Sequence, residues 1–206
     1  MNELHGLLTS SGSIVGFFLQ VLPFALLAGA VYALCRHVRR ARTGEPAGFW
    51  DGLVRTLFVC YLAGLAGLLL APNNFWIWLW QCILDGSGTV AVGPLFQGGF
   101  DFGLTLVRWL KGELTLGSWV KTMLIANVAM FLPLGFFLPF VSKKVNAKNI
   151  WAIAAAAPLL IECVQPVMGR SFDIDDLIMN FAGTIIGYFV AASVRALARR
   201  AKFTKS

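Results

Sequence analysis

The chain alternates between long apolar segments and short polar connections. A helix needs about 20 mostly apolar residues to cross the hydrocarbon core of a bilayer. Five segments approach that length, and they cover residues 14–35, 49–71, 123–141, 150–167 and 177–194. Because the last two are short, we expect a thinned bilayer or flanking residues that reach the interface there. The pattern predicts an all-α integral membrane bundle of about five transmembrane helices, with one long outer loop that carries interfacial segments.

The composition excludes two other classes of protein. Hydrophobic residues make up 58% of the 206 residues, charged residues 13%, and the mean hydropathy is +0.74. A soluble domain is about half apolar and a quarter charged, so neither a soluble globular enzyme nor a disordered chain fits. We therefore expect a single multi-pass membrane domain over residues 1–206.

The basic residues predict the orientation of the helices. Thirteen of the 17 Lys and Arg residues fall in three stretches, residues 36–55, 143–148 and 195–205, which five crossings place on one side. Cytoplasmic connections carry such an excess of positive charge. We expect a bacterial plasma-membrane protein with its N-terminus outside and its C-terminus in the cytoplasm. The net charge of +7 is then explained by the basic residues of the cytoplasmic side, and no nucleic-acid partner is expected.

Residues 72–118 form the only long connection. An apolar run at 75–84 is too short to cross a bilayer and contains three tryptophans. Tryptophan prefers the headgroup level, which predicts an interfacial or re-entrant segment. Residues 100–114 mix apolar and charged side chains, which predicts an amphipathic helix on the outer leaflet. The alternative is that this loop merely caps the bundle.

Polar side chains inside the predicted spans indicate a functional site, because hydrocarbon rejects ionisable groups at a cost of several kcal/mol. Three predicted helices bring such groups to within roughly 8 Å of the outer boundary, at a rise of about 1.5 Å per residue. Together with the acidic connection before the fifth helix, they predict a ligand-binding pocket in the outer leaflet. Its candidate residues are Asn127, Glu162, Gln165, Arg170, Asp173, Asp176 and Asn180.

The connection between the fourth and fifth helices allows two interpretations. Asp173 and Asp176 fall at or near a helix N-terminus, where carboxylates are favourable. One aspartate would then cap the helix, and Arg170 would pair with the other or with Glu162. In the functional interpretation, Arg170 instead holds an anionic headgroup in a pocket that opens to the outer leaflet.

Small residues predict where the helices pack. Gly183 and Gly187 are four residues apart and share one face of the fifth helix, so a neighbouring helix can approach closely. Gly135, two residues after Pro133 in the third helix, is the third candidate for helix packing.

At these residues the chain resembles the VanZ-like family of small bacterial membrane proteins, named for a teicoplanin-resistance accessory protein. The motifs are the stretch 127–135, Glu162-x-x-Gln165 and the stretch 170–187. The resemblance covers about residues 50–194 and is strongest over 123–194. It implies a multi-pass plasma-membrane protein and, for some relatives, reduced susceptibility to lipoglycopeptide antibiotics. It implies no particular chemical reaction.

Three functions follow as alternatives. In the first, a non-catalytic envelope protein without a cofactor binds the anionic or polyol headgroup of a membrane lipid or lipid-linked envelope precursor, and so contributes to teicoplanin-type resistance. In the second, Glu162, Asp173 and Asp176 hold a divalent cation in an intramembrane enzyme that acts on such a headgroup. No HExxH or GxSxG motif supports that enzyme. The third is a small-solute or ion carrier, although carriers usually place their site near the midplane.

Overall fold

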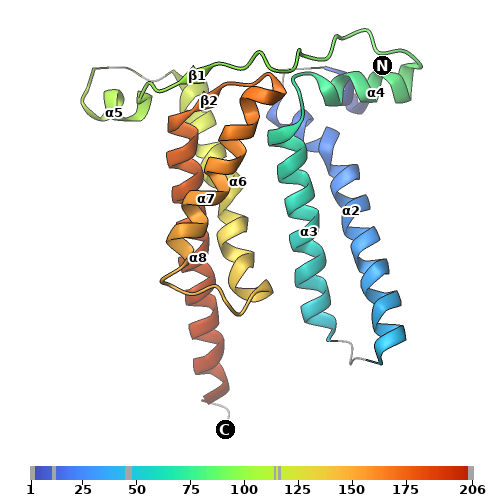
Figure 1. Ribbon diagram of the computed structural model, residues 1–206, viewed down its shortest axis with the longest axis vertical. Helices are drawn as coiled ribbons and strands as arrows, with labels where there is room; N and C mark the ends of the chain where they lie inside the picture. Colours follow the sequence, from blue (N-terminus) through green and yellow to red (C-terminus); the bar gives the residue numbers. More distant parts are fainter. Residues whose placement is uncertain (1–2, 11–12, 45–47, 114, 116, 204–206) are drawn as a thin grey trace. The chain divides into compact units, whose positions relative to one another are not determined.

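The computed structural model is mostly helical (Figure 1). It describes residues 3–10, 13–44, 48–113, 115 and 117–203. The elements in chain order are α1 (Glu3–Thr9), α2 (Ile14–Thr43), α3 (Phe49–Leu70), α4 (Phe75–Asp85), β1 (Phe100–Asp101), α5 (Thr105–Leu110), α6 (Ser118–Val141), α7 (Ile150–Val164), the 3₁₀ helix η1 (Gln165–Met168), β2 (Phe172–Asp173) and α8 (Ile174–Phe203). The strands β1 and β2 form a two-stranded sheet.

Five stretches of the described helices are long and apolar enough to cross a membrane, and they are Ile14–Thr43, Phe49–Leu70, Val120–Val141, Ile150–Met168 and Ile174–Arg200. This confirms the prediction of an all-α chain with five transmembrane helices. Helix α2 continues eight residues past the apolar segment that predicted it, because arginine and alanine are good helix formers outside hydrocarbon as well. It ends at Gly44, whose left-handed backbone (φ 67°) lets its N–H bond the carbonyl of Arg40.

The chain divides into two compact units. The first unit comprises Met1–Gly99 and Cys163–Phe172, and the second comprises Phe100–Glu162 and Asp173–Ser206.

In the first unit, α2 and α3 pack as an antiparallel pair (Figure 1). A Cβ atom added at Gly64 would lie 3.6 Å from the Cβ of Ala25, and one added at Gly67 would lie 2.8 Å from Val21. Residue numbers fall along α2 as they rise along α3, which defines the antiparallel direction. Small residues at these contacts bring the two backbones close together.

Helix α4 lies across the end of α2 and α3 (Figure 1). The indole N–H of Trp76 donates to the carbonyl of Gly67 at 2.7 Å, and that of Trp80 donates to the carbonyl of Gln20 at 2.9 Å. These two indoles therefore bond the protein backbone, and α4 covers the end of the helix pair.

The prediction of an amphipathic helix over residues 100–114 is wrong in the length of the helix. Among the described residues of that stretch, only Thr105–Leu110 is helical. Before it, the Asp101 carboxylate accepts a hydrogen bond from the backbone N–H two residues on, which forms a turn. After it, Gly112 adopts φ 74° and ends the helix. Leu114 lies outside the described residues.

In the second unit, α6 and α8 run side by side in the same direction. A Cβ atom at Gly183 would overlap the carbonyl oxygen of Val128, and one at Gly187 would overlap that of Leu132. One at Gly135 would in turn overlap a carbonyl oxygen of α8. Because contacts of this kind leave no room for a side chain, the glycines set the distance between the two helices.

Candidate functional site

Five of the predicted site residues lie in the second unit, near the end at which α6 and α8 begin and α7 finishes. With Asp175 they form a group that we call the polar cluster, and its members are Asn127, Glu162, Asp173, Asp175, Asp176 and Asn180. Their side chains are half-buried or buried, and Glu162 and Asn180 are only 1% and 2% exposed. Such burial is unusual for these residue types unless their polar atoms are paired.

Asn127 and Asp176 join α6 to α8. The amide nitrogen of Asn127 donates a hydrogen bond to the Asp176 carboxylate oxygen Oδ1. The glycines described above bring the helices close enough for these two short side chains to meet.

Glu162 and Asp173 hold the start of α8. The backbone N–H of Asp173 donates to Oε2 of Glu162 at 3.1 Å, which ties α8 to the end of α7. The Oδ1 atom of Asp173 accepts a hydrogen bond from the backbone N–H of Asp175 at 2.8 Å. Because α8 begins at Ile174, Asp173 caps it in the manner expected of an aspartate.

Asp175 is not among the site residues predicted from the sequence, and the structure buries it to 3% exposure. Its carboxylate oxygen Oδ2 accepts a hydrogen bond from the backbone N–H of Thr105 at 2.7 Å, which fixes the start of α5 to α8. The three aspartates in the run 173–176 were the available signal. Helical periodicity does not show that the segment around Thr105, before α6, contacts the run 173–176.

Asn180 has a buried polar atom without a partner. Its side-chain oxygen Oδ1 is buried and accepts no hydrogen bond, whereas its backbone carbonyl accepts one from the Thr184 hydroxyl at 3.0 Å. A buried acceptor that is left unpaired costs about 1–3 kcal/mol. Asn180 is one turn after Asp176 and shares its face of α8. A ligand with a hydrogen-bond donor would offset that cost.

Burial raises the pKa of the Asp173 carboxyl above its usual range, because a charged group is less favourable away from water. The hydrogen bond from the Asp175 backbone lowers this pKa in part. The nearby carboxyls of Asp175 and Asp101 raise it further through charge repulsion. Several carboxyl groups therefore lie close together in the cluster, and their oxygens are hydrogen-bond acceptors.

The other two predicted residues, Gln165 and Arg170, lie in the first unit. The guanidinium nitrogen Nη1 of Arg170 donates to the carbonyl of Leu68 at 2.8 Å. Leu68 belongs to the last turn of α3, whose carbonyls have no partner within the helix. The backbone of Gln165 accepts a hydrogen bond from the N–H of Arg170 at 3.0 Å, and its side chain is buried. Arg170 thus has a structural contact at the end of α3.

The described residues contain no group of three or more His, Cys, Asp or Glu side chains that could hold a metal ion. The carboxylates suggested for a divalent cation, those of Glu162, Asp173 and Asp176, therefore do not meet in such a group.

The fold defines a multi-pass membrane protein with five candidate spans. A model of the VanZ/LLP1 family matches residues 58–195, and the chain belongs to this family. The match confirms the resemblance drawn from the motifs in the last three spans. Comparisons with curated proteins and with solved structures found no significant match.

Proposed function

We propose that the polar cluster binds an anionic or polyol headgroup of a lipid or lipid-linked wall precursor, and that this binding reduces susceptibility to teicoplanin-type antibiotics. The unpaired Oδ1 atom of Asn180 is the observation that carries the proposal. The excess of basic residues on the opposite side supports an orientation in which the cluster belongs to the outer leaflet. Antibiotics of this type act at that surface.

The chemistry of the cluster favours a polyol over a purely anionic headgroup. Hydroxyl groups donate hydrogen bonds, and the cluster offers carboxylate and amide oxygens as acceptors. An anionic group would meet the carboxyl groups of Asp173, Asp175 and Asp176. The pKa of Asp173 is already raised, first by burial and then by repulsion from the carboxyls of Asp175 and Asp101. Asp173 and Asp176 are half-buried, so a hydroxyl can approach from their side.

Native mass spectrometry of the purified chain in micelles tests this proposal with two defined lipids. One is a neutral diglucosyl diacylglycerol, which carries a polyol headgroup, and the other is phosphatidic acid, which is anionic without a polyol. In Asn180→Leu the acceptor is replaced by an apolar side chain of similar volume. Thr184→Val is the matched control, because it removes a buried hydroxyl one turn further along the same helix.

We expect wild type and Thr184→Val to retain the glycolipid and Asn180→Leu to lose at least nine-tenths of it, while phosphatidic acid binding stays the same in all three. Equal glycolipid binding by wild type and Asn180→Leu would refute the proposal. Conversion of the bound glycolipid to a product of different mass would show that the protein is an enzyme instead.

The antibiotic effect needs a separate measurement in cells. At equal membrane abundance, cells that express the wild type should tolerate more teicoplanin than cells that express Asn180→Leu. Equal inhibitory concentrations would separate headgroup binding from resistance and refute the second half of the proposal.

A further inference from the structure

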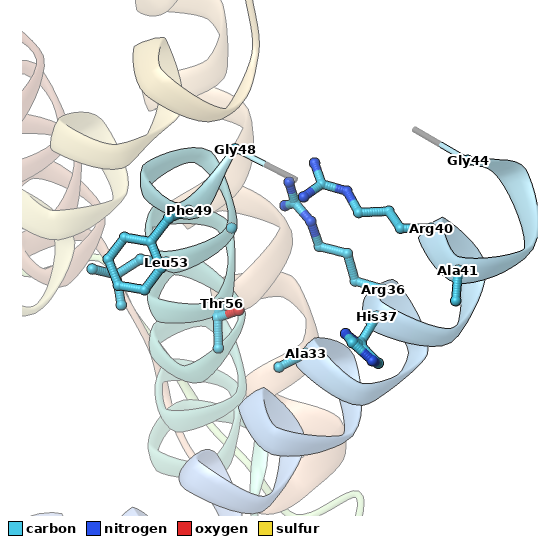
Figure 2. A pocket seen from close by; sticks show the side chains of 11 residues that line it. Ala33, Arg36, His37, Arg40, Ala41, Gly44, Gly48, Phe49, Leu53 and Thr56 are labelled. Carbon is cyan, nitrogen blue, oxygen red and sulfur yellow. The ribbon is translucent and has the colours of Figure 1, made fainter. Parts of the chain in front are cut away.

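The first unit contains a hollow between the end of α2 and the start of α3 (Figure 2). Its volume is about 660 Å³. Small residues create it, since Ala33, Gly48 and Gly52 lie along its walls. A Cβ atom added at Gly52 would meet nothing nearer than the guanidinium carbon of Arg36 at 3.9 Å. At the other end of the pair, by contrast, a Cβ at Gly67 would lie 2.8 Å from α2.

The hollow is strongly basic. Arg36 and Arg40 are one turn apart on α2, and their side chains extend side by side toward the start of α3 (Figure 2). Over residues 33–56 the sequence has five arginines against two acidic residues. The composition of this stretch therefore leaves an excess of positive charge.

The carboxylate of Asp51 forms ion pairs with three of these arginines. It pairs with Arg36, lies 2.9 Å from Nε of Arg55 and lies 3.6 Å from the guanidinium of Arg40. Among the described residues, the carboxylate of Asp51 thus faces three guanidinium groups. The contact to Arg40 is too long for a good hydrogen bond, so Arg40 retains donors for another anion.

The start of α3 adds further donors. Its N-cap residue, Gly48, makes no side-chain capping hydrogen bond. The first N–H groups of a helix have no partner within it, and the helix dipole favours an anion there. Phe49 and Leu53 also line the hollow, and they are 71% and 38% exposed. The hollow therefore combines a basic floor with an apolar wall.

We propose that this hollow binds an anionic phospholipid, with its phosphate between Arg36, Arg40 and the first turn of α3. One acyl chain lies along Phe49 and Leu53, which is the reason to expect a lipid instead of a free anion. Basic hollows between transmembrane helices recognise anionic headgroups in this way. This lipid site is independent of the polar cluster and of its proposed ligand.

Native mass spectrometry with dioleoyl phosphatidic acid, and with phosphatidylcholine as the zwitterionic comparison, tests this site on the full chain. Arg40→Gln removes one anion contact. Arg39→Gln removes the same charge from an exposed neighbour that does not line the hollow, so it is the matched control. Gly52→Leu fills the hollow without changing the charge. Glycerol phosphate serves as the probe without acyl chains.

We expect Arg40→Gln to weaken phosphatidic acid binding about tenfold, since a charge-assisted hydrogen bond contributes about 1.4 kcal/mol or more. Gly52→Leu should weaken it about tenfold as well, because the leucine side chain takes up space in the hollow. Arg39→Gln should change it less than twofold, and diglucosyl diacylglycerol binding should be unchanged in all three. If Arg39→Gln and Arg40→Gln weaken binding equally, diffuse surface charge accounts for it and the site is refuted. Glycerol phosphate binding as tight as that of the lipid would refute the acyl contact.

Circular dichroism shows whether Gly52→Leu folds. If it does not, the comparison of Arg40→Gln with Arg39→Gln still decides the proposal.

Discussion

The close contact between α6 and α8 predicts that one added methyl group at a glycine in this contact lowers the unfolding free energy of the protein. In Gly187→Ala the new Cβ atom would lie 2.9 Å from the carbonyl carbon of Leu132 and 2.9 Å from the backbone nitrogen of Phe136. Ordinary contacts between such atoms are about 3.5–4.0 Å. The new Cβ atom would also overlap the carbonyl oxygen of Leu132. All three neighbours are backbone atoms, so the two helices must separate by more than about 1 Å to admit the methyl group.

Overpacking of this kind typically costs about 1–3 kcal/mol. Alanine also gains up to about 1 kcal/mol over glycine in helix propensity, which would partly hide the loss. Gly64→Ala supplies the control, because its Cβ would lie 3.6 Å from Ala25 in an ordinary contact. The propensity gain is common to both variants. The difference between their unfolding free energies therefore measures the packing, and we expect Gly187→Ala to be less stable by about 1–3 kcal/mol.

The measurement is equilibrium unfolding of the full chain in mixed micelles of a mild detergent and dodecyl sulfate, followed by circular dichroism. A difference below about 0.5 kcal/mol between Gly187→Ala and Gly64→Ala, within the usual scatter of surface substitutions, would refute the close contact.

The same unfolding measurement tests three further predictions. The raised pKa of Asp173 means that the folded protein holds this proton more tightly than the unfolded chain. Its unfolding free energy should therefore fall as the pH rises through and above the usual carboxyl range, and Asp173→Asn should remove that dependence while its amide oxygen keeps the helix cap. Asn127→Leu should cost about 0.5–1.5 kcal/mol, because the hydrogen bond between Asn127 and Asp176 is lost. Trp80→Phe should cost about 0.5–1.5 kcal/mol, because the carbonyl of Gln20 loses the indole N–H.

Each of these has an outcome that contradicts it. Wild type and Asp173→Asn with parallel pH profiles would show that Asp173 keeps an ordinary pKa. An Asn127→Leu variant as stable as the wild type would mean that the hydrogen bond from Asn127 to Asp176 does not stabilise the protein. An unchanged Trp80→Phe variant would mean that the indole bond contributes nothing to the cap over α2 and α3.

The five transmembrane helices could be predicted because a bilayer imposes a length of apolar sequence that is visible without any structure. The helix ends could not be predicted in the same way. Hydropathy marks where the hydrocarbon ends, whereas a helix continues until its backbone meets a residue such as Gly44 that ends it. The stretch 100–114 shows the opposite error. Its composition suits an amphipathic helix, but the Asp101 side chain bonds the backbone and starts a turn.

The sequence predicts the level in the bilayer at which the candidate site residues lie, but it predicts only some of the contacts that they make. Counting residues along a helix gives the level of Asn127 and Asp176 in the bilayer, because the rise per residue is fixed. It does not show which side chains a loop brings together. Asp175 accepts a hydrogen bond from the backbone of Thr105, 70 residues earlier in the chain, and Arg170 donates one to the carbonyl of Leu68, 102 residues earlier. Only the folded connection determines such contacts.

A substitution at Asn180 can distinguish a structural role of the polar cluster from a functional one. If the cluster only fastened the helices, every buried polar atom in it should contribute to stability, and replacing Asn180 with leucine should destabilise the protein. Its Oδ1 atom has no partner, however, and an unpaired buried acceptor costs about 1–3 kcal/mol. Asn180→Leu should therefore leave the protein as stable as the wild type or more so, while glycolipid binding is lost. Since binding sites commonly sacrifice stability for function, that combination distinguishes a ligand-binding residue from one that only holds the fold.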